Sequence, residues 1–434
     1  MALIITIIVL LILAMVSIAL VMNSGIITKS KTAVDKYSQE EIQEQIKLAY
    51  AEWQTAQWTS DAGDAATFMQ TRLRTSLKDN GLTVTGSNGV FVAKLSNNKK
   101  YVYDSKTGGM LDEVPVSAYP AATAGTATTE NSTYTSDGKT AVIPAGYTVD
   151  ATQNSIDNGL VISKDGNEWV WIPVSSEDLA LMYTEDSTGW TMSGTSGENA
   201  VVTKYRSTGT VSRGNPGTDS LREPDILTDL DEGDINDSES IKAAGLGNNA
   251  IEMAKKLKNE YENMIKSLIK NKGFYVGRYE LSNSGVKKNQ PSWFETNSDW
   301  YHLYKKCTEL ENDGAISRMM WGCQWDQICK FISTAKNANG ETIDLNNSSS
   351  YGNYSTRINT GSNEQYKTNN IYDLAGNCCE YTQEAYGKNM RPSRGGFYNN
   401  YHHGYESLLN SASYGNPHIL NDNNTTTRPV LILR

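Results

Sequence analysis

The first 22 residues are an uninterrupted apolar segment, and no other feature constrains the fold as strongly. The segment reads MALIITIIVLLILAMVSIALVM, with Thr6 and Ser17 as its polar residues and no charged side chain. Since a helix rises by about 1.5 Å per residue, this length reaches ~33 Å and can cross the hydrocarbon layer of a membrane. A cleaved secretory signal would carry a basic region, a shorter apolar core and a small-residue cleavage site, and this segment has none of them.

An amphipathic stretch follows after a short break at residues 23–25. Its apolar side chains recur at steps of three and four residues, as they do on one face of a helix. They are Ile42, Ile46, Ala49 and Trp53. We therefore expect one long helix over residues 1–58, apolar in 1–22 and amphipathic afterwards.

A small domain is expected over residues 59–113. The stretch DAATFMQTRLRTSLKDNG predicts a helix that ends at Gly81. The next two stretches, LTVTGSNGVFVAKL and KKYVYDSKTGGML, alternate apolar and polar residues around turns at 87–89, 97–98 and 108–109. Together these patterns predict a helix packed on a small antiparallel sheet.

This N-terminal organisation resembles that of the type IV pilins. The resemblance implies a subunit that is anchored in the inner membrane before assembly and then forms a helical homopolymer through its N-terminal helix, as an extracellular filament on the cell surface. Two features depart from the pilin pattern. Ile5 stands where pilins usually carry Glu, and the short basic leader is absent, so the chain is either a processed form or begins inside the usual motif. A plain membrane anchor is the alternative interpretation.

The sequence changes twice after the small domain. Residues 114–141 are rich in Thr, Ala, Ser and Gly without an apolar period, which predicts a linker or a loosely ordered strap. From 142 to 434, short Trp- and Tyr-rich stretches alternate with long polar loops. We expect this last range to be one large domain.

Six segments of the large domain together resemble the formylglycine-generating-enzyme (sulfatase-modifying factor) family, a variant of the C-type lectin fold. They are GLVISKDGNEWVWIPV (159–174), GFYVGRYELS (273–282), WGCQWDQICKFI (321–332), NIYDLAGNCCEYT (370–382), RPSRGGFYNN (391–400) and TTTRPVLILR (425–434). The fold class expected for the chain is therefore α+β, a long pilin helix with a small antiparallel-sheet head followed by a C-type lectin-like domain.

Aromatic packing is expected to build the core of the large domain, because such folds have little repetitive structure. The core tryptophans expected are Trp169, Trp171, Trp321 and Trp325. A helix is also predicted, with one apolar side made by Ile251, Ala254, Leu257, Tyr261, Ile265 and Leu268.

Catalysis is not expected. Aerobic members of the resembled family oxidise a substrate cysteine with a copper-binding cysteine pair near the C-terminus, and this sequence has no cysteine after Arg394. Its five cysteines, at 307, 323, 329, 378 and 379, have no zinc or haem spacing, and Cys378 and Cys379 replace the family's usual Val-Trp as small apolar residues. One disulfide among them is left open. The sequence has four histidines but no G-x-S-x-G motif, so a Ser-His-Asp catalytic site lacks support.

The family resemblance also implies a structural calcium ion, although no cofactor is required. Family members hold Ca²⁺ in a GNxxE turn through carboxylate, amide and carbonyl oxygens, and Asn377 and Glu380 stand at the matching positions. The alternative is a turn closed by the hydrogen bonds of these two side chains alone.

The segment near the C-terminus predicts a binding surface. Its blocks 399–405, 414–416 and 418–424 consist of Asn and of Tyr, His, Gly, Ile, Leu and Asp residues reachable by changing the adenines of Asn codons, which resembles the variable region of proteins diversified by diversity-generating retroelements. Tyr supplies rigid contact area and Asn and His supply adaptable hydrogen bonds. The candidate ligand-binding residues are Tyr398, Asn400, Tyr401, His402, His403, Tyr405, Tyr414, Asn416, His418, Asn421 and Asp422. The alternative is an ordinary Asn-rich exposed loop.

The charge of the chain excludes one class of partner. A net charge of -10 and the lack of clustered Lys and Arg argue against nucleic acid. We expect a filament subunit that displays a non-catalytic, lectin-like adhesion domain toward a surface, glycan or protein ligand. The alternatives are a membrane-anchored oxidase of the formylglycine-generating type, and a pilin whose large domain is only a structural coat.

Overall fold

The computed structural model describes residues 26–59, 62–182, 238–292, 299–312, 314–337, 339–345, 347–383, 391–398, 412–415 and 424–434, and it gives the backbone alone for 26–38, 58–59, 180–182, 238, 250–251, 254–255, 258 and 412–415. The chain divides into two compact units, Met1–Tyr119 and Pro120–Arg434. Helices alternate with several antiparallel sheets in the described residues, so the predicted mixed α+β class is confirmed.

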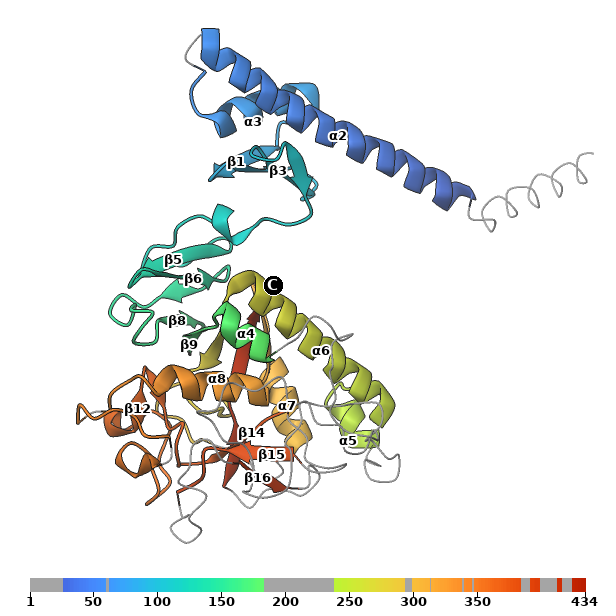
Figure 1. Cartoon of the computed structure of the whole chain (residues 1–434). Coiled ribbons are helices and arrows are strands. Elements are labelled where there is room, and N and C mark those ends of the chain that lie inside the picture. The colour runs from blue at the N-terminus through green and yellow to red at the C-terminus, as the bar shows by residue number, and fades with distance from the viewer. Residues whose placement is uncertain are drawn as a thin grey trace, which may run out of the picture. The chain divides into compact units, whose positions relative to one another are not determined.

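The first unit packs two helices against a four-stranded sheet (Figure 1). The sheet is an antiparallel meander in the order β1-β2-β3-β4, as the alternating pattern predicts. Its elements are α2 (Ile26–Thr59), α3 (Ala65–Ser76), β1 (Thr83–Ser87), β2 (Val90–Lys94), β3 (Lys100–Asp104) and β4 (Gly109–Leu111).

The apolar stripe of α2 forms one side of the core of this unit. Ile46 and Ala49 are fully buried, and Ile42 and Trp53 pack against them while half-buried, so the predicted stripe is confirmed. The adjacent Tyr50 ring lies 5.3 Å from the rings of both Phe91 and Tyr103, which joins α2 to strands β2 and β3.

The predicted membrane span at residues 1–22 lies outside the described residues. Within the part of the chain that the structure describes, no helix combines the length and the apolar character that crossing a membrane requires.

The predicted linker differs from the structure. Residues 114–141 contain a 3-10 helix, η1 (Val116–Ala118), and most of an antiparallel hairpin, β5 (Ser132–Ser136) and β6 (Lys139–Ile143). Asp137 and Gly138 both have positive φ angles, 54° and 69°, and such an Asp-Gly pair makes the turn that matches the twist of a hairpin. The Tyr275 hydroxyl donates to the Val142 carbonyl over 2.9 Å, so this hairpin belongs to the second unit.

The second unit is built around a six-stranded antiparallel sheet in the order β11-β18-β10-β9-β8-β7, and a separate four-stranded sheet has the order β16-β15-β14-β17. In the smaller sheet β14 and β17 are parallel. The strands are β7 (Thr148–Val149), β8 (Val161–Lys164), β9 (Asn167–Pro173), β10 (Gly273–Gly277), β11 (Ala315–Met319), β12 (Lys367–Thr368), β13 (Ile371–Tyr372), β14 (Cys379–Tyr381), β15 (Arg391–Arg394), β16 (Ala412–Gly415), β17 (Thr425–Thr427) and β18 (Pro429–Leu433).

Helices cover the larger sheet. Helix α6 contacts β10 and β18, and α8 contacts β9 (Figure 1). The helices of this unit are α4 (Ser176–Met182), α5 (Ser238–Ala243), α6 (Ala250–Asn271), α7 (Trp300–Thr308) and α8 (Gly322–Ile332), with short 3-10 turns η4 (Ser348–Ser350) and η5 (Glu364–Tyr366).

The core of the second unit is aromatic, as predicted. The four tryptophans expected in it are all at most 1% exposed: Trp169, Trp171, Trp321 and Trp325. On α6 the predicted apolar side is buried at Leu257, Tyr261, Ile265 and Leu268, whereas the side chains of Ile251 and Ala254 lie outside the described residues.

Candidate functional site

A tight turn after β13 carries Asn377, the first of the two residues predicted as calcium ligands, and leads into β14, which carries the second, Glu380. Asp373, Gly376 and Asn377 all adopt left-handed backbone angles, with φ of 54°, 76° and 59°. A Cβ atom on Gly376 would lie 2.2 Å from the Asn353 carbonyl oxygen, so glycine is the one residue that fits there. The Gly376 N–H donates to the Gly395 carbonyl over 2.7 Å. The YDLAGN and RGG segments are therefore tied together.

The Asn377 side chain is fully buried and hydrogen-bonded at both ends. Its Nδ2 donates to Glu280 Oε2 over 2.6 Å and to Ser292 Oγ over 2.9 Å. Its Oδ1 accepts from Asn353 Nδ2 at 3.2 Å and from the Ile358 N–H at 3.0 Å. This one amide joins four separate segments of the chain.

Glu380 lies on β14 and forms a fully buried ion pair with Arg428. The guanidinium reaches both carboxylate oxygens, with Nη2 to Oε1 at 2.6 Å and Nε to Oε2 at 3.1 Å. Its remaining N–H groups donate to the carbonyls of Gly277 and Tyr372 over 2.9 and 2.8 Å. The pair connects β14 to the strands of the larger sheet.

These contacts bear on the predicted calcium ion. The Arg428 guanidinium already supplies a positive charge to Glu380, and the Asn377 oxygen accepts two hydrogen bonds. In the described part of the chain, no three His, Cys, Asp or Glu side chains are arranged to hold a metal ion. In this arrangement Asn377 and Glu380 do not fit a calcium site, and their contacts match the hydrogen-bonded alternative. Calcium binding itself stays a prediction.

Three carboxyl groups surround the single Arg428 guanidinium in this interior. Glu280, Asp373 and Glu380 are each 0% exposed. Burial raises the pKa of Glu280 well above its usual range, that of Asp373 to about 6 and that of Glu380 to about 7. Asp373 Oδ2 accepts from Thr360 Oγ1 and the Gly361 N–H, while its Oδ1 is buried without a partner among the described residues. The cluster therefore retains protons near neutral pH.

The Asn- and Tyr-rich segment leaves this buried cluster and returns to it. On one side β15 pairs with β14, with Arg394 opposite Glu380. On the other side β17 runs parallel to β14, with Thr426 opposite Glu380, and leads directly into Arg428. Both ends are buried, since Arg394 is 1% and Thr426 0% exposed. The framework on either side of the predicted binding segment is thus fixed by the core.

Of the eleven predicted binding residues, the structure describes Tyr398 fully and Tyr414 by its backbone. The half-buried Tyr398 has its N–H bonded to the Asn377 carbonyl over 3.1 Å, and the Arg357 guanidinium lies 5.8 Å from its ring. Tyr414 lies opposite Pro392 in the β15–β16 pairing. The others lie outside the described residues: Asn400, Tyr401, His402, His403, Tyr405, Asn416, His418, Asn421 and Asp422.

The cysteines have the environment of core residues. All five are buried, none forms a disulfide, and the prediction that Cys378 and Cys379 replace apolar residues is confirmed. Burial raises the pKa of the Cys307, Cys329 and Cys378 thiols well above the usual range, so these groups stay protonated. A protonated, buried thiol is a poor nucleophile and a poor ligand for copper.

Three members of the buried cluster, Glu280, Asp373 and Arg428, were not predicted as site residues. Glu280 and Arg428 lie in the quoted segments GFYVGRYELS and TTTRPVLILR, yet nothing in the sequence pairs them. The available signal was a charged residue inside an otherwise apolar strand segment, because such a residue is buried only with a partner.

Comparisons with known proteins give a distant structural similarity. No known sequence family and no curated protein matches this chain. The solved structure of CarF is 13% identical with a TM-score of 0.27, and the alignment covers 37% of this chain and 87% of CarF. Treponema denticola variable protein 1 is 12% identical with a TM-score of 0.26, over 37% of this chain and 84% of that protein. The chain is thus a mixed α+β protein that is distantly similar to both over part of its length.

Proposed function

We propose that this chain is a structural subunit of an extracellular, pilus-like filament, and that its second unit displays a non-catalytic, lectin-like domain for ligand binding. The observation that carries the binding role is the placement of the Asn- and Tyr-rich segment. It connects β15 to β17, and both strands flank Glu380 on β14 in the buried interior. A rigid frame of this kind allows side chains of the segment to change without loss of the fold.

The composition of the segment supports recognition rather than catalysis. Tyr, Asn, His, Ser and Gly dominate residues 398–422. Tyrosine gives a large contact area at low entropic cost, and the small polar residues adapt their hydrogen bonds to the ligand. The buried, protonated thiols described above do not support the alternative of an oxidase.

The filament role is supported by the N-terminal sequence together with the first unit. Twenty-two uncharged residues precede α2, and α2 packs through its apolar stripe on a small antiparallel sheet. A uniformly apolar helix is stable in lipid before assembly and in a bundle of identical helices afterwards, because neither environment offers water to a polar side chain.

A quadruple variant tests the binding role: Tyr401→Ala, His402→Ala, Tyr405→Ala and Tyr414→Ala in the full chain. We expect filaments to form normally while adhesion of filament-bearing cells to glycan- or protein-coated surfaces is lost. The matched control replaces half-buried or exposed residues of the same types elsewhere, Tyr119→Ala, Tyr134→Ala and His302→Ala, and retains adhesion.

The same experiment separates the alternatives. Lost filaments would favour a large domain that acts as a structural coat. Intact filaments with unchanged adhesion would contradict a binding surface in this segment.

Diversification of the segment has its own test in the neighbouring DNA. We expect a near copy of the last coding stretch that differs at adenines of the variable codons, next to a reverse transcriptase. A locus without such a copy would remove diversification from the proposal and leave a fixed binding surface.

A further inference from the structure

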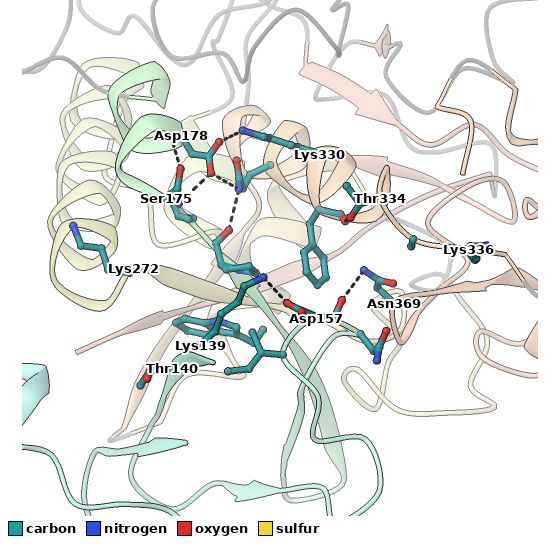
Figure 2. Close-up of a pocket in the computed structure, with 18 residues that line it drawn as sticks. Lys139, Thr140, Asp157, Ser175, Asp178, Lys272, Lys330, Thr334, Lys336 and Asn369 are labelled. Atoms are coloured by element: carbon teal, nitrogen blue, oxygen red, sulfur yellow. Dashed lines mark hydrogen bonds and ion pairs between the residues drawn. The ribbon is translucent and has the colours of Figure 1, made fainter. Parts of the chain in front are cut away.

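The second unit contains a cavity of about 940 Å³, and none of its described lining residues belongs to the Asn- and Tyr-rich segment. Its walls come from parts of the chain far apart in sequence, including hairpin strand β6, the end of β9, α4 and α8 (Figure 2). Pockets of about 300–1,000 Å³ commonly hold small ligands. The cavity is large enough for an oligosaccharide of a few rings.

The charge of this cavity is opposite to that of the whole chain. Four lysines and two aspartates line it, whereas the chain has a net charge of -10. Lys139 pairs with Asp157, and Lys330 pairs with Asp178. The other two lysines, Lys272 and Lys336, are exposed and have no ion-pair partner among the described residues.

The two lysines without partners lie at opposite sides of the cavity, with the two ion pairs between them (Figure 2). An extended ligand with more than one negative group can pair with a lysine on each side. Positive charges at both ends of the cavity therefore favour an anion with repeated acidic groups.

The remaining lining suits a ligand with many hydroxyl groups. Asp157 and Asp178 accept hydrogen bonds, and Thr140, Asn158, Ser175, Thr334 and Asn369 provide further donors and acceptors. A ligand made only of phosphates has no hydrogen-bond donors for the two carboxylates, whereas sugar hydroxyls can donate to them. Phe331 gives the cavity a half-buried aromatic surface.

Two buried polar atoms of the lining residues have no hydrogen-bond partner in the described structure. They are the indole Nε1 of Trp171 and the Oε1 of Gln327. Both atoms are buried beneath the cavity surface, so an occupant contacts the exposed polar groups of the lining rather than these two atoms. Gln327 is held in place because its Nε2 donates to the Pro173 carbonyl over 2.9 Å and to Asp178 Oδ2 over 3.2 Å.

We propose that this cavity binds an acidic oligosaccharide, with uronate or sulfate groups at Lys272 and Lys336 and sugar hydroxyls at the two lysine-paired aspartates. The site uses other described residues than those of the Asn- and Tyr-rich segment and is a second ligand site of the second unit.

Calorimetric titration of the full chain with a hyaluronan tetrasaccharide tests this site. Its neutral counterpart is tetra-N-acetylchitotetraose, which lacks the two carboxylates. We expect the acidic sugar to bind at least tenfold more tightly than the neutral one, and its affinity to fall as salt is added. A chondroitin sulfate tetrasaccharide, which carries the same number of uronates and sulfate groups in addition, shows whether sulfate adds to the affinity.

A double variant, Lys272→Asn with Lys336→Gln, should weaken binding of the acidic sugar at least tenfold. Asparagine is chosen because Lys272 has a φ of 58°, which Asn tolerates. The control is Lys266→Gln with Lys305→Gln, two exposed lysines outside the cavity, and it should bind normally. The quadruple variant of the Asn- and Tyr-rich segment should also bind the tetrasaccharide normally.

Three results would overturn the proposal. One is equal affinity for the acidic and neutral sugars, and another is unchanged binding by the double variant. The third is the absence of binding by both acidic tetrasaccharides.

Discussion

Arg428 is the single residue on which the buried cluster depends most. It bonds both oxygens of Glu380 and the carbonyls of Gly277 and Tyr372, all without access to water. Replacing it by Met would remove the positive charge and the hydrogen-bond donors on which Glu380 and the two carbonyls depend in this buried interior. We expect Arg428→Met to lower the free energy of unfolding by about 3–5 kcal/mol in urea denaturation.

The control for this prediction is Arg434→Met. Arg434 also pairs with a glutamate, Glu311, but on the surface. Exposed ion pairs contribute little because water and salt screen them. If both variants were equally stable, burial of the Arg428 pair would not be the source of its contribution.

The three buried carboxyl groups predict a pH dependence with a definite sign. The folded state binds protons at Asp373 and Glu380 with pKa values of about 6 and about 7, above the usual values near 4 of the unfolded chain. Their contribution to stability is therefore complete below about pH 4 and is lost as the pH rises through about 6 to 7.

Asp373→Asn tests this linkage, because it removes one charge and keeps the oxygen that accepts from Thr360 and Gly361. We expect the variant to lose less stability than the natural chain between pH 5 and pH 8, as measured by urea denaturation at each pH. Parallel curves would show that Asp373 keeps the same protonation in the folded and unfolded states.

At the scale of secondary structure, the N-cap residue Asp64 stabilises the first turn of α3. Asp64 accepts hydrogen bonds from the Thr67 N–H and hydroxyl, both at 2.9 Å. Asp64→Ala should cost about 1 kcal/mol. Faster hydrogen exchange of the α3 amides would report this loss. Asp64→Asn keeps the accepting oxygen and is expected to exchange nearly as slowly as the natural chain.

The helices with a repeated apolar spacing could be predicted from the sequence, whereas the β5–β6 hairpin was not predicted. The apolar stripes of α2 and α6 repeat over several helical turns, so their helices and buried faces followed from the spacing. The β5–β6 hairpin has no such repeat. Its Thr and Ser residues suggested a linker, although Asp137-Gly138 was a usable turn signal.

The turn of the candidate site could be predicted from the sequence, but the residues that pair with its side chains could not. The YDLAGN motif indicated Asn377 and Glu380. The partner of Asn377, Glu280, is 97 residues away, and Arg428 is 48 residues from Glu380. Such pairs arise from the order of strands in the sheets, which one sequence does not reveal. The cavity escaped prediction for the same reason, since its walls meet only in the folded unit.

For the whole molecule, the apolar segment and the displayed domain have separable roles. The segment provides an uncharged helix for lipid or for a helix bundle, whereas the second unit has its own core built around buried tryptophans. A change in the segment should therefore affect assembly without affecting the ligand sites.

Leu11→Arg tests this separation, because Leu11 is at the middle of the apolar segment. A charged side chain at the centre of a membrane helix costs about 2.5–3.5 kcal/mol, and in a bundle of identical helices the cost recurs in every subunit. We expect Leu11→Arg to abolish filaments in electron micrographs, while the purified chain still binds the acidic tetrasaccharide. The control Leu11→Met preserves apolar character and volume and should form normal filaments. Normal filaments from the arginine variant would mean that this segment is not buried in a filament core.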